Sequence, residues 1–461
     1  MHKGVLKMRQ KMTPQTNIFN TMARSKIAKE LQHISEILDE NPEMLDHIYQ
    51  DLTVKGRSDT GRDGMTAEQV LRAVVLKQQR NLSYEELAFH LEDSHAFRSF
   101  ARLNMGQYPC ASVLQENIKA VSESTWQEIH NILINYAASR KIEKGRKIKM
   151  DATVVATNIH EPSDSTLLVD GVRLITRLLN QGHRFSPCPA YTFSDHTRVM
   201  KKRLKTILNI RKEEVRACAY RDMIHYARRV CLYAEEAVSV LSVFAGATCE
   251  DTLGSKGLAM KIEKAAHLLK RVIDQTDRRI FKKESVPASE KVISFFESHS
   301  DIIVKNNRET EYGHKVFFVA GTSHLILDCM IEEENPADST KFMPLLERQE
   351  SLYRRMPRQV SVDGGFASGD NLKKARGAGV KDIAFSKRRG LKVLDMVKSN
   401  WVYKKLRNFR AGIEANISTL KRAYGLSRCN WTGWEGFKQY VWSSVISYNL
   451  LVMARLTMKG A

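Results

Sequence analysis

The sequence lacks the cysteine pairs and long apolar runs of a disulfide-bonded, zinc-binding or membrane-spanning protein. Its seven cysteines are an odd number, widely scattered and without a CxxC pair, which argues against a disulfide framework or zinc knuckle and fits a reducing compartment. No stretch reaches the ~18 uncharged apolar residues of a membrane span. The basic start MHKGVLKMRQKM leads into no apolar run of signal-peptide type. We therefore expect a cytoplasmic protein without a membrane partner.

Acidic residues are outnumbered by basic ones. The chain of 461 residues has 73 Lys and Arg against 52 Asp and Glu, a formal charge of +21 and an isoelectric point near 9.6. A polyanion, and nucleic acid first, is the expected partner. A generally basic protein without such a partner is the alternative at this point. The length predicts two or three domains.

The first 140 residues have helical character. After Gly64, two short segments place apolar residues at helical spacing, and Ser83 with Glu86 forms a capping box at the start of the second. Short helices joined by tight turns in a basic protein indicate a helix-turn-helix-like DNA-binding module. The same pattern also fits a plain helical packing domain. We predict an all-α N-terminal DNA-binding domain over residues 1–140.

From residue 141 the pattern changes to alternating strands and helices. Strand character lies at 147–159, 314–322, 323–333, 358–365 and 381–386, and helices are expected at 341–355, 369–377, 403–423 and 434–456. A helical block at 166–300 follows the first strand. Without that block, the order matches a ribonuclease H-like fold: an α/β domain over 141–461 with a five-stranded mixed sheet and flanking helices, interrupted by the 166–300 insertion.

Three acidic residues stand where such a sheet would bring them together. Asp151 lies on the first strand, Asp363 directly follows the fourth strand, and Glu414 lies in the helix after the fifth. The first and fourth strands are neighbours in this fold. Carboxylates are the ligands that Mg²⁺ prefers, and phosphodiester chemistry uses two such ions about 3.5–4 Å apart. Each acid alone is weak evidence, because an Asp at a strand end is commonly a turn or capping residue.

The helix that carries Glu414 adds two cations to the pattern. Arg410 and Lys421 lie four residues before and seven residues after Glu414, so all three project from one helical face. A glutamate between two cations suits a site where metal ions meet a phosphate backbone. An ordinary solvated face with an ion pair four residues apart is the alternative.

These residues resemble the DDE transposases of bacterial insertion sequences. The resemblance is strongest in MDATVVATNIHEPSDSTLLVDGVRLITRLL, YGHKVF, VSVDGGFASGDN and the block from Phe409 to Asn449, which contains the family's spacing of an Arg, three residues, a Glu, six residues and a Lys. Related enzymes often have a Tyr three positions before that Arg, whereas this chain has Arg407. The tract ATNIHEPSDSTLLVDGVR is similar to a group often called ISNCY.

The resemblance implies an enzyme that binds the terminal inverted repeats of its element and cuts and joins DNA. Asp151, Asp363 and Glu414 would be the catalytic, metal-binding residues for two Mg²⁺ ions, or Mn²⁺ in their place. Arg410, Lys421, Lys315 and His314 would contact DNA, although polar positions on an edge strand explain the last two equally well. Double-stranded DNA at the element ends and the target is the partner, and a homodimer or larger assembly would hold two ends in the nucleoid.

Other readings of the same residues remain open. A ribonuclease H-like nuclease or resolvase that joins no strands shares the acids and the charge, and so does a non-catalytic DNA-binding regulator derived from a transposase. Asp328, on the third strand, is a poorer ligand candidate because that strand is remote from the first and fourth. The helical insertion is expected to bind DNA or a second subunit, from its basic runs Lys201–Arg203 and Arg228–Arg229.

Overall fold

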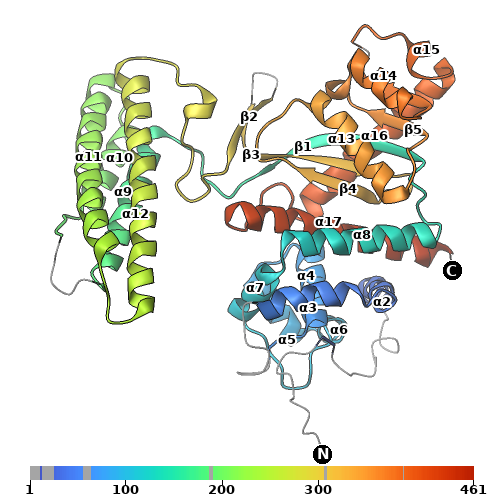
Figure 1. Cartoon of the computed structure of the whole chain (residues 1–461), viewed down its shortest axis with the longest axis horizontal. Helices are drawn as coiled ribbons and strands as arrows, with labels where there is room; N and C mark the ends of the chain where they lie inside the picture. The colour runs from blue at the N-terminus through green and yellow to red at the C-terminus, as the bar shows by residue number, and fades with distance from the viewer. Residues whose placement is uncertain are drawn as a thin grey trace, which may run out of the picture. The chain divides into compact units, whose positions relative to one another are not determined.

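The chain forms two compact units, each described here by itself. The computed structural model describes residues 11–12, 25–54, 64–185, 191–305, 309–387 and 389–460. Unit 1 comprises residues 1–158 and 303–461, and unit 2 comprises residues 159–302 (Figure 1). Residues 61–63, which precede the two short helical segments predicted after Gly64, and Cys188 lie outside the described residues.

Unit 1 begins with seven described helices. They are α2 (Lys26–Asp39), α3 (Met44–Val54), α4 (Ala67–Arg80), α5 (Tyr84–Asp93), α6 (His95–Phe100), α7 (Ala111–Ala120) and α8 (Glu123–Ser139). The capping box predicted for α5 is present, since the Ser83 side chain accepts from the Glu86 backbone and the Glu86 side chain accepts from the Ser83 backbone. Asn41 and Pro42 lie between α2 and α3.

The helices α4 and α5 differ in burial and in charge. All residues of α4 from Ala67 to Gln78 are buried, and its Gln78 side chain donates to Ser443 Oγ of the C-terminal helix at 2.9 Å. The exposed helix α5 contains four acidic residues and neither Lys nor Arg. Neither helix thus has the exposed basic face that entry into a DNA groove requires.

The centre of unit 1 is a six-stranded mixed sheet. Its strands are β1 (Lys147–Ala156), β2 (Asp301–Lys305), β3 (Glu309–Ala320), β4 (Ile326–Ile331), β5 (Gln359–Val362) and β6 (Asp382–Phe385). The order is β2-β3-β1-β5-β6, with β4 also paired to β3. The predicted number of five was wrong by one. The missed strand β2 contains a short β-branched run, Ile-Ile-Val, and lies directly after the segment 166–300 that we assigned to the helical block.

The register of the sheet decides which residues share a face. β1 runs parallel to β5, with Met150 opposite Val362, and antiparallel to β3, with Asp151 opposite Phe318. The expected neighbourhood of the first strand and the strand before Asp363 is therefore confirmed. Since side chains alternate along a strand, Asp151 and Lys149 point to one face of the sheet, and Met150 points to the other.

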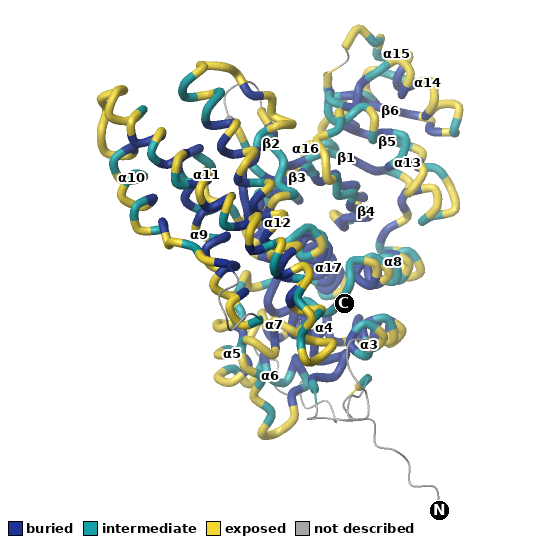
Figure 2. Tube along the Cα trace, turned by 60° about the vertical axis from the view of Figure 1, so that its left-hand side comes forward, coloured by how far each residue is buried: buried dark blue, intermediate teal, exposed yellow. Residues whose placement is uncertain are grey.

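Helices cover both faces of this sheet. They are α13 (Asp338–Tyr353), α14 (Gly369–Gly377), α15 (Val393–Met396), α16 (Asn400–Ala423) and α17 (Gly433–Gly460), with a 3-10 turn at Gly364–Phe366. Phe342 of α13 packs on Phe385 of β6, on the face of Met150. Helix α16 contacts β1, β5 and β6, on the face of Asp151. Figure 2 shows that the strands and α17 hold much of the buried core.

Unit 2 is a bundle of four long helices with its own apolar core. They are α9 (Asp164–Gly182), α10 (Thr197–Asn209), α11 (Glu213–Val243) and α12 (Cys249–Thr276), followed by short helical turns at Asp277–Phe281 and Ala288–Glu290. The predicted helical block over 166–300 is thus helical to residue 281, and its last part is largely irregular. Within the described residues, no helix is long and apolar enough to span a membrane.

Candidate active site

The first predicted acid, Asp151, lies on the central strand β1. Its side chain is only 19% exposed, because strands β3 and β5 flank it and α16 lies over its face of the sheet. The carboxylate accepts a hydrogen bond from the backbone N–H of Ala152 at 2.8 Å. A carboxylate this buried needs compensating partners, and these come from α16.

The second acid, Asp363, directly follows β5, where the chain turns into Gly364-Gly365. Ser386 Oγ, just beyond the neighbouring strand β6, donates to Asp363 Oδ1 at 2.7 Å. Partial burial alone would raise the pKa of Asp363, but the bonds from Ser386 and from the Gly364 and Gly365 backbone, together with the Arg410 charge, hold that pKa below its ordinary value. Asp363 is therefore kept ionised. Ser386 was not singled out from the sequence.

The third acid, Glu414, lies in the middle of α16 and is more than half exposed. Arg410 Nη2, one turn earlier, donates to Glu414 Oε1 at 2.6 Å. The predicted common face of these two residues is confirmed. Lys421 lies on the same helix two turns further on and is half-buried.

The three acids meet at the guanidinium of Arg410. Its Nη1 lies 3.4 Å from Asp151 Oδ2 and 3.7 Å from Asp363 Oδ1, while its Nη2 contacts Glu414. Burial raises the pKa of Asp151 to about 6, and the negative charges of Asp363 and Glu414 add to this rise, while Ala152 and Arg410 oppose it. One cation thus faces three carboxylates, which leaves a local excess of negative charge.

Three contacts fix α16 over the acids. Ser361 Oγ, on β5, donates to the carbonyl oxygen of Leu406 at 2.8 Å. Gly412 leaves room for the Lys149 side chain that rises from β1, since a Cβ there would lie 2.5 Å from Lys149 Nζ. After the helix, the backbone of Cys429 donates to the carbonyl of Ala156 at the end of β1, at 2.7 Å. These contacts fix the position of α16 over the sheet and therefore the position of Glu414 relative to the other two acids.

Lys149 is a buried cation beneath this helix, and sequence reasoning missed it. It is 1% exposed, and its Nζ lies 4.9 Å from the centre of the Phe409 ring. Burial lowers the pKa of Lys149 to about 8, with Glu143 opposing the shift. A lysine in the middle of a strand two residues before a candidate ligand is the signal that would have found it.

The donor set has the chemistry of a site for hard divalent cations. It offers carboxylate oxygens from three separate elements and an excess of negative charge, which Mg²⁺ or Mn²⁺ would balance. In the described part of the chain, no three His, Cys, Asp or Glu side chains lie close enough together to hold one metal ion. The acids are gathered around Arg410 instead, and its guanidinium occupies the space between them.

Two residues predicted to contact DNA have other partners in the structure. His314 is fully buried, with its ring 4.5 Å from that of Trp434 and its Nδ1 3.0 Å from the carbonyl oxygen of Glu333. Lys315 Nζ donates to Asp338 Oδ1 at 3.1 Å and lies on the sheet face opposite Asp151. Neither contact brings the side chain to the Arg410 cluster.

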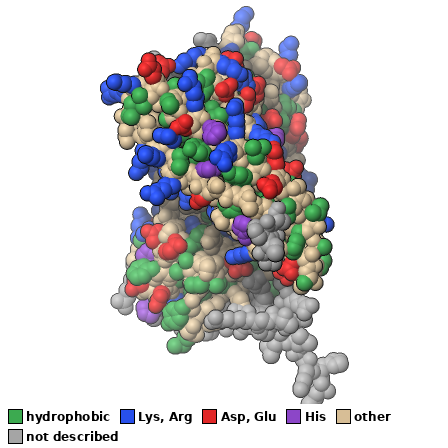
Figure 3. Space-filling view, turned by 90° about the vertical axis from the view of Figure 1, so that its left-hand side faces the viewer, with side chains coloured by type: hydrophobic (Ala, Val, Ile, Leu, Met, Phe, Trp, Pro, Cys, Tyr) green, Lys and Arg blue, Asp and Glu red, His purple; other side chains and the backbone are tan. Residues whose placement is uncertain are grey.

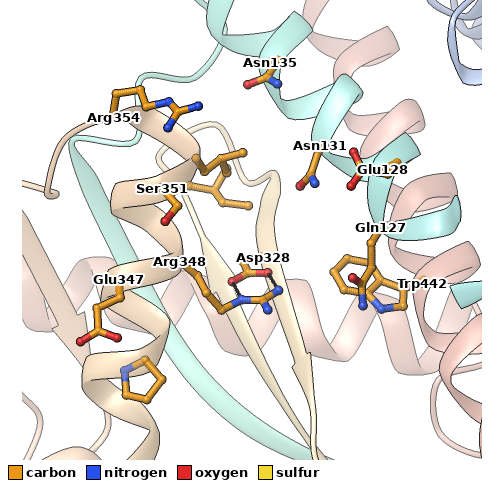
Figure 4. Close-up of a pocket in the computed structure, with 13 residues that line it drawn as sticks. Gln127, Glu128, Asn131, Asn135, Asp328, Glu347, Arg348, Ser351, Arg354 and Trp442 are labelled. Carbon is orange, nitrogen blue, oxygen red and sulfur yellow. Dashed lines mark hydrogen bonds and ion pairs between the residues drawn. The ribbon is translucent and has the colours of Figure 1, made fainter. Parts of the chain in front are cut away.

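Asp328 does not lie in the Arg410 cluster but lines a polar pocket of about 830 Å³ between α8, β4, α13 and α17. Arg348 Nε and Nη2 each donate to this carboxylate at 2.6 Å, and the pair lies in the centre of the pocket (Figure 4). Amide side chains of α8 line the opposite wall. Since the Asp328 side chain is 8% exposed and already paired with Arg348, its position supports the expectation that it is a poorer ligand candidate.

Two family models match the chain. The one described as "Transposase DDE domain" matches residues 269–450, a range that contains Asp363, Arg410 and Glu414. The one described as "Transposase domain (DUF772)" matches residues 20–120, which contain α2 to α7. Asp151 lies between the two ranges, upstream of the helical insertion. No curated protein and no solved structure matches the chain.

Proposed function

We propose that this chain, which belongs to the DDE transposases of insertion sequences, cuts and joins DNA with Asp151, Asp363 and Glu414 as its catalytic acids. The meeting of these carboxylates at one guanidinium, from β1, the end of β5 and the middle of α16, is the observation that supports the assignment. More than 200 residues separate the first acid from the second in sequence. The ribonuclease H-like arrangement is part of this proposal.

The three acids would hold two Mg²⁺ ions, or Mn²⁺ in their place, once the Arg410 guanidinium no longer lies between them. Such ions supply activation of the attacking oxygen and stabilisation of the leaving oxygen in an in-line displacement at phosphorus. Asp363, kept ionised by Ser386 and the backbone, is ready as a ligand at neutral pH. Asp151 is buried and therefore fixes the inner side of the site, whereas Glu414 approaches from the exposed side.

Arg410 has two roles in this proposal. Without metal its guanidinium balances the charge of the three carboxylates and prevents their mutual repulsion. With that charge balanced by bound cations, Arg410 would be free to contact backbone phosphate beside the scissile bond, and Lys421 would extend the same contact along α16. Such contacts position the strand and carry no sequence information. We do not include His314 and Lys315 in this surface, because their side chains are engaged elsewhere.

The N-terminal helices and the assembly complete the proposal. Residues 1–140 help to recognise the inverted repeats, residues 141–461 carry out the chemistry, and two copies hold two element ends together on the nucleoid. The ISNCY-like subgroup is also part of the proposal, since both matching models describe transposases in general.

The test is cleavage of a duplex that carries the element ends, with Mg²⁺ or Mn²⁺. Asp151→Asn, Asp363→Asn and Glu414→Gln each abolish cleavage and leave binding of the ends nearly unchanged. Asp370→Asn is the matched control, because this exposed acid of α14 pairs with Lys374 and does not touch the cluster. A variant of the three that cuts normally removes its residue from the site.

The products decide between transposition and simple hydrolysis. A transposase joins the freed 3′ ends to a second duplex, so a slower-migrating joined product appears with the wild-type chain. Cleavage that never gives this product, at any ratio of target to end DNA, identifies a nuclease or resolvase instead. Binding without cleavage, with all three acids intact, identifies a DNA-binding regulator.

A further inference from the structure

Helix α10 of unit 2 differs in charge from the other three helices of its bundle. Its thirteen residues, TRVMKKRLKTILN, contain five Lys and Arg and no Asp or Glu. By the same count, α9 has two basic and two acidic residues, α11 has four basic and five acidic residues, and α12 has five basic and four acidic residues. Figure 3 shows Lys and Arg gathered along one edge of the molecular face that it presents.

The cations of α10 lie on one side of the helix. Met200 and Ile207 are buried against the bundle, and the exposed cations are on the side away from them: Arg198, Lys201, Lys202 and Lys205. From Arg198 to Lys205 the helix rises about 10 Å. Measured along the axis of a duplex, that length covers about three phosphates of one strand, whose spacing along the axis is about 3.4 Å.

The helix is held firmly in the bundle, so this surface is preformed. Arg203, the fifth cation, points sideways and donates to Asp222 of α11 at 2.8 Å. His196, which precedes the first turn of α10, packs its ring 4.9 Å from Tyr226 and 6.1 Å from Tyr233 of α11. Ordering these side chains on binding therefore needs no folding of the helix itself.

We propose that the outer face of α10 is a docking surface for the phosphate backbone of duplex DNA, distinct from the acids of unit 1. Four exposed ammonium and guanidinium groups without an acid on the same helix are complementary to a line of phosphates. The buried α4 and the acidic α5 offer no such face. The partner class follows from the transposase assignment, but the surface does not depend on which acids perform the chemistry.

The experiment compares two triple variants of the full-length chain. Lys201→Gln/Lys202→Gln/Lys205→Gln removes three charges from α10, and Lys256→Gln/Lys261→Gln/Lys264→Gln removes three exposed charges from α12 as the matched control. Fluorescence anisotropy gives the affinity for a labelled duplex between low and moderate salt. The α10 variant lowers the slope of log affinity against log salt by about 2 to 3, at ~0.9 for each lost phosphate contact, and the control leaves it unchanged.

Other results overturn the inference. An unchanged slope, or an equal loss in the α12 control, removes α10 as the docking surface. A loss seen with end-containing duplex but not with an unrelated duplex of equal length contradicts a phosphate contact, which reads no sequence. A change in oligomeric state in sedimentation, with DNA affinity intact, assigns the face to a second copy. Circular dichroism confirms that helix content is unchanged in both variants.

Failure of this inference and failure of the catalytic assignment are separable. Asp151→Asn keeps the wild-type salt slope and loses cleavage, whereas the α10 variant has the lower salt slope and still gives cleaved product at low salt. If the α10 variant keeps the wild-type salt slope while Asp151→Asn is inactive, the docking surface is overturned and the catalytic assignment stands.

Discussion

Ser361 Oγ and the carbonyl oxygen of Leu406 are 2.8 Å apart, and this hydrogen bond ties β5 to α16 beneath the three acids. Ser361 is fully buried and lies two residues before Asp363. The carbonyl belongs to the turn of α16 that leads to Arg410. A single side chain thus connects the strand of one acid to the helix of another.

Ser361→Ala is expected to impair chemistry more than folding. The lost bond costs about 1 kcal/mol of stability, while the freed helix displaces Glu414 and lowers the cleavage rate at saturating DNA by roughly tenfold. Ser443→Ala is the control, because it removes a buried hydroxyl of α17 that accepts from Gln78 and lies outside the acid cluster. Equal loss of activity in both variants would assign a purely structural role to Ser361.

Arg410→Gln is expected to increase metal affinity and to decrease cleavage. Removing the guanidinium leaves three repelling carboxylates, so Mn²⁺ no longer competes with a resident cation and binds roughly three- to tenfold more tightly. In EDTA the same variant unfolds at a lower temperature than the wild type, and Mn²⁺ restores the difference. Electron paramagnetic resonance of free Mn²⁺ measures the binding. Weaker metal binding in this variant would contradict the charge-balancing role.

Arg348→Met is expected to destabilise unit 1 without affecting the chemistry. It leaves the buried Asp328 carboxylate unpaired, at a cost of about 2–3 kcal/mol, while Asp328→Asn/Arg348→Met recovers part of that loss. All five tryptophans lie in unit 1, so urea unfolding followed by tryptophan fluorescence reports this unit alone. Cleavage at saturating DNA stays at the wild-type rate, because Asp328 is on the face opposite Asp151.

Acid is expected to destabilise unit 1 through His130. Burial lowers the pKa of His130 below its ordinary 6.5, although its bond to the Ile326 carbonyl opposes the shift. Below pH 6.5 the unfolded chain binds a proton that the folded chain does not, so stability falls as the pH falls from 6.5 toward the folded-state pKa. His130→Asn, which retains a hydrogen-bonding side chain, flattens this dependence in urea titrations at several pH values. An unchanged pH dependence would rule His130 out as its source.

The strands and the acids were predictable because their signals are local. β-branched alternation marks Lys147–Ala156 as a strand, and the order of elements places β1 beside β5, which brings Asp151 near Asp363. The four-residue spacing of Arg410 and Glu414 dictates their contact on a helix. The contacts that follow from residue spacing or from the order of elements could therefore be predicted from the sequence.

The remaining features depend on tertiary packing that no short pattern encodes. His314 alternates to the same face as Asp151, but Trp434 from a distant helix covers it. Ser386 acts on Asp363 only because β6 pairs with β5. The position of Arg410 between three acids depends on how closely α16 approaches β1, which Gly412 permits. Each of these contacts involves an element far away in the chain, so the local sequence does not predict it.

The helical unit leaves the sheet after β1 and returns through β2, and both of these strands are bonded to β3. An excursion of this kind begins and ends on the two strands that flank β3. Its helices α9 to α12 contribute no strand to the sheet, so the order of the strands does not depend on them. Substitutions within the helical unit therefore leave intact the pairing of β1 with β5, which places Asp151 near Asp363.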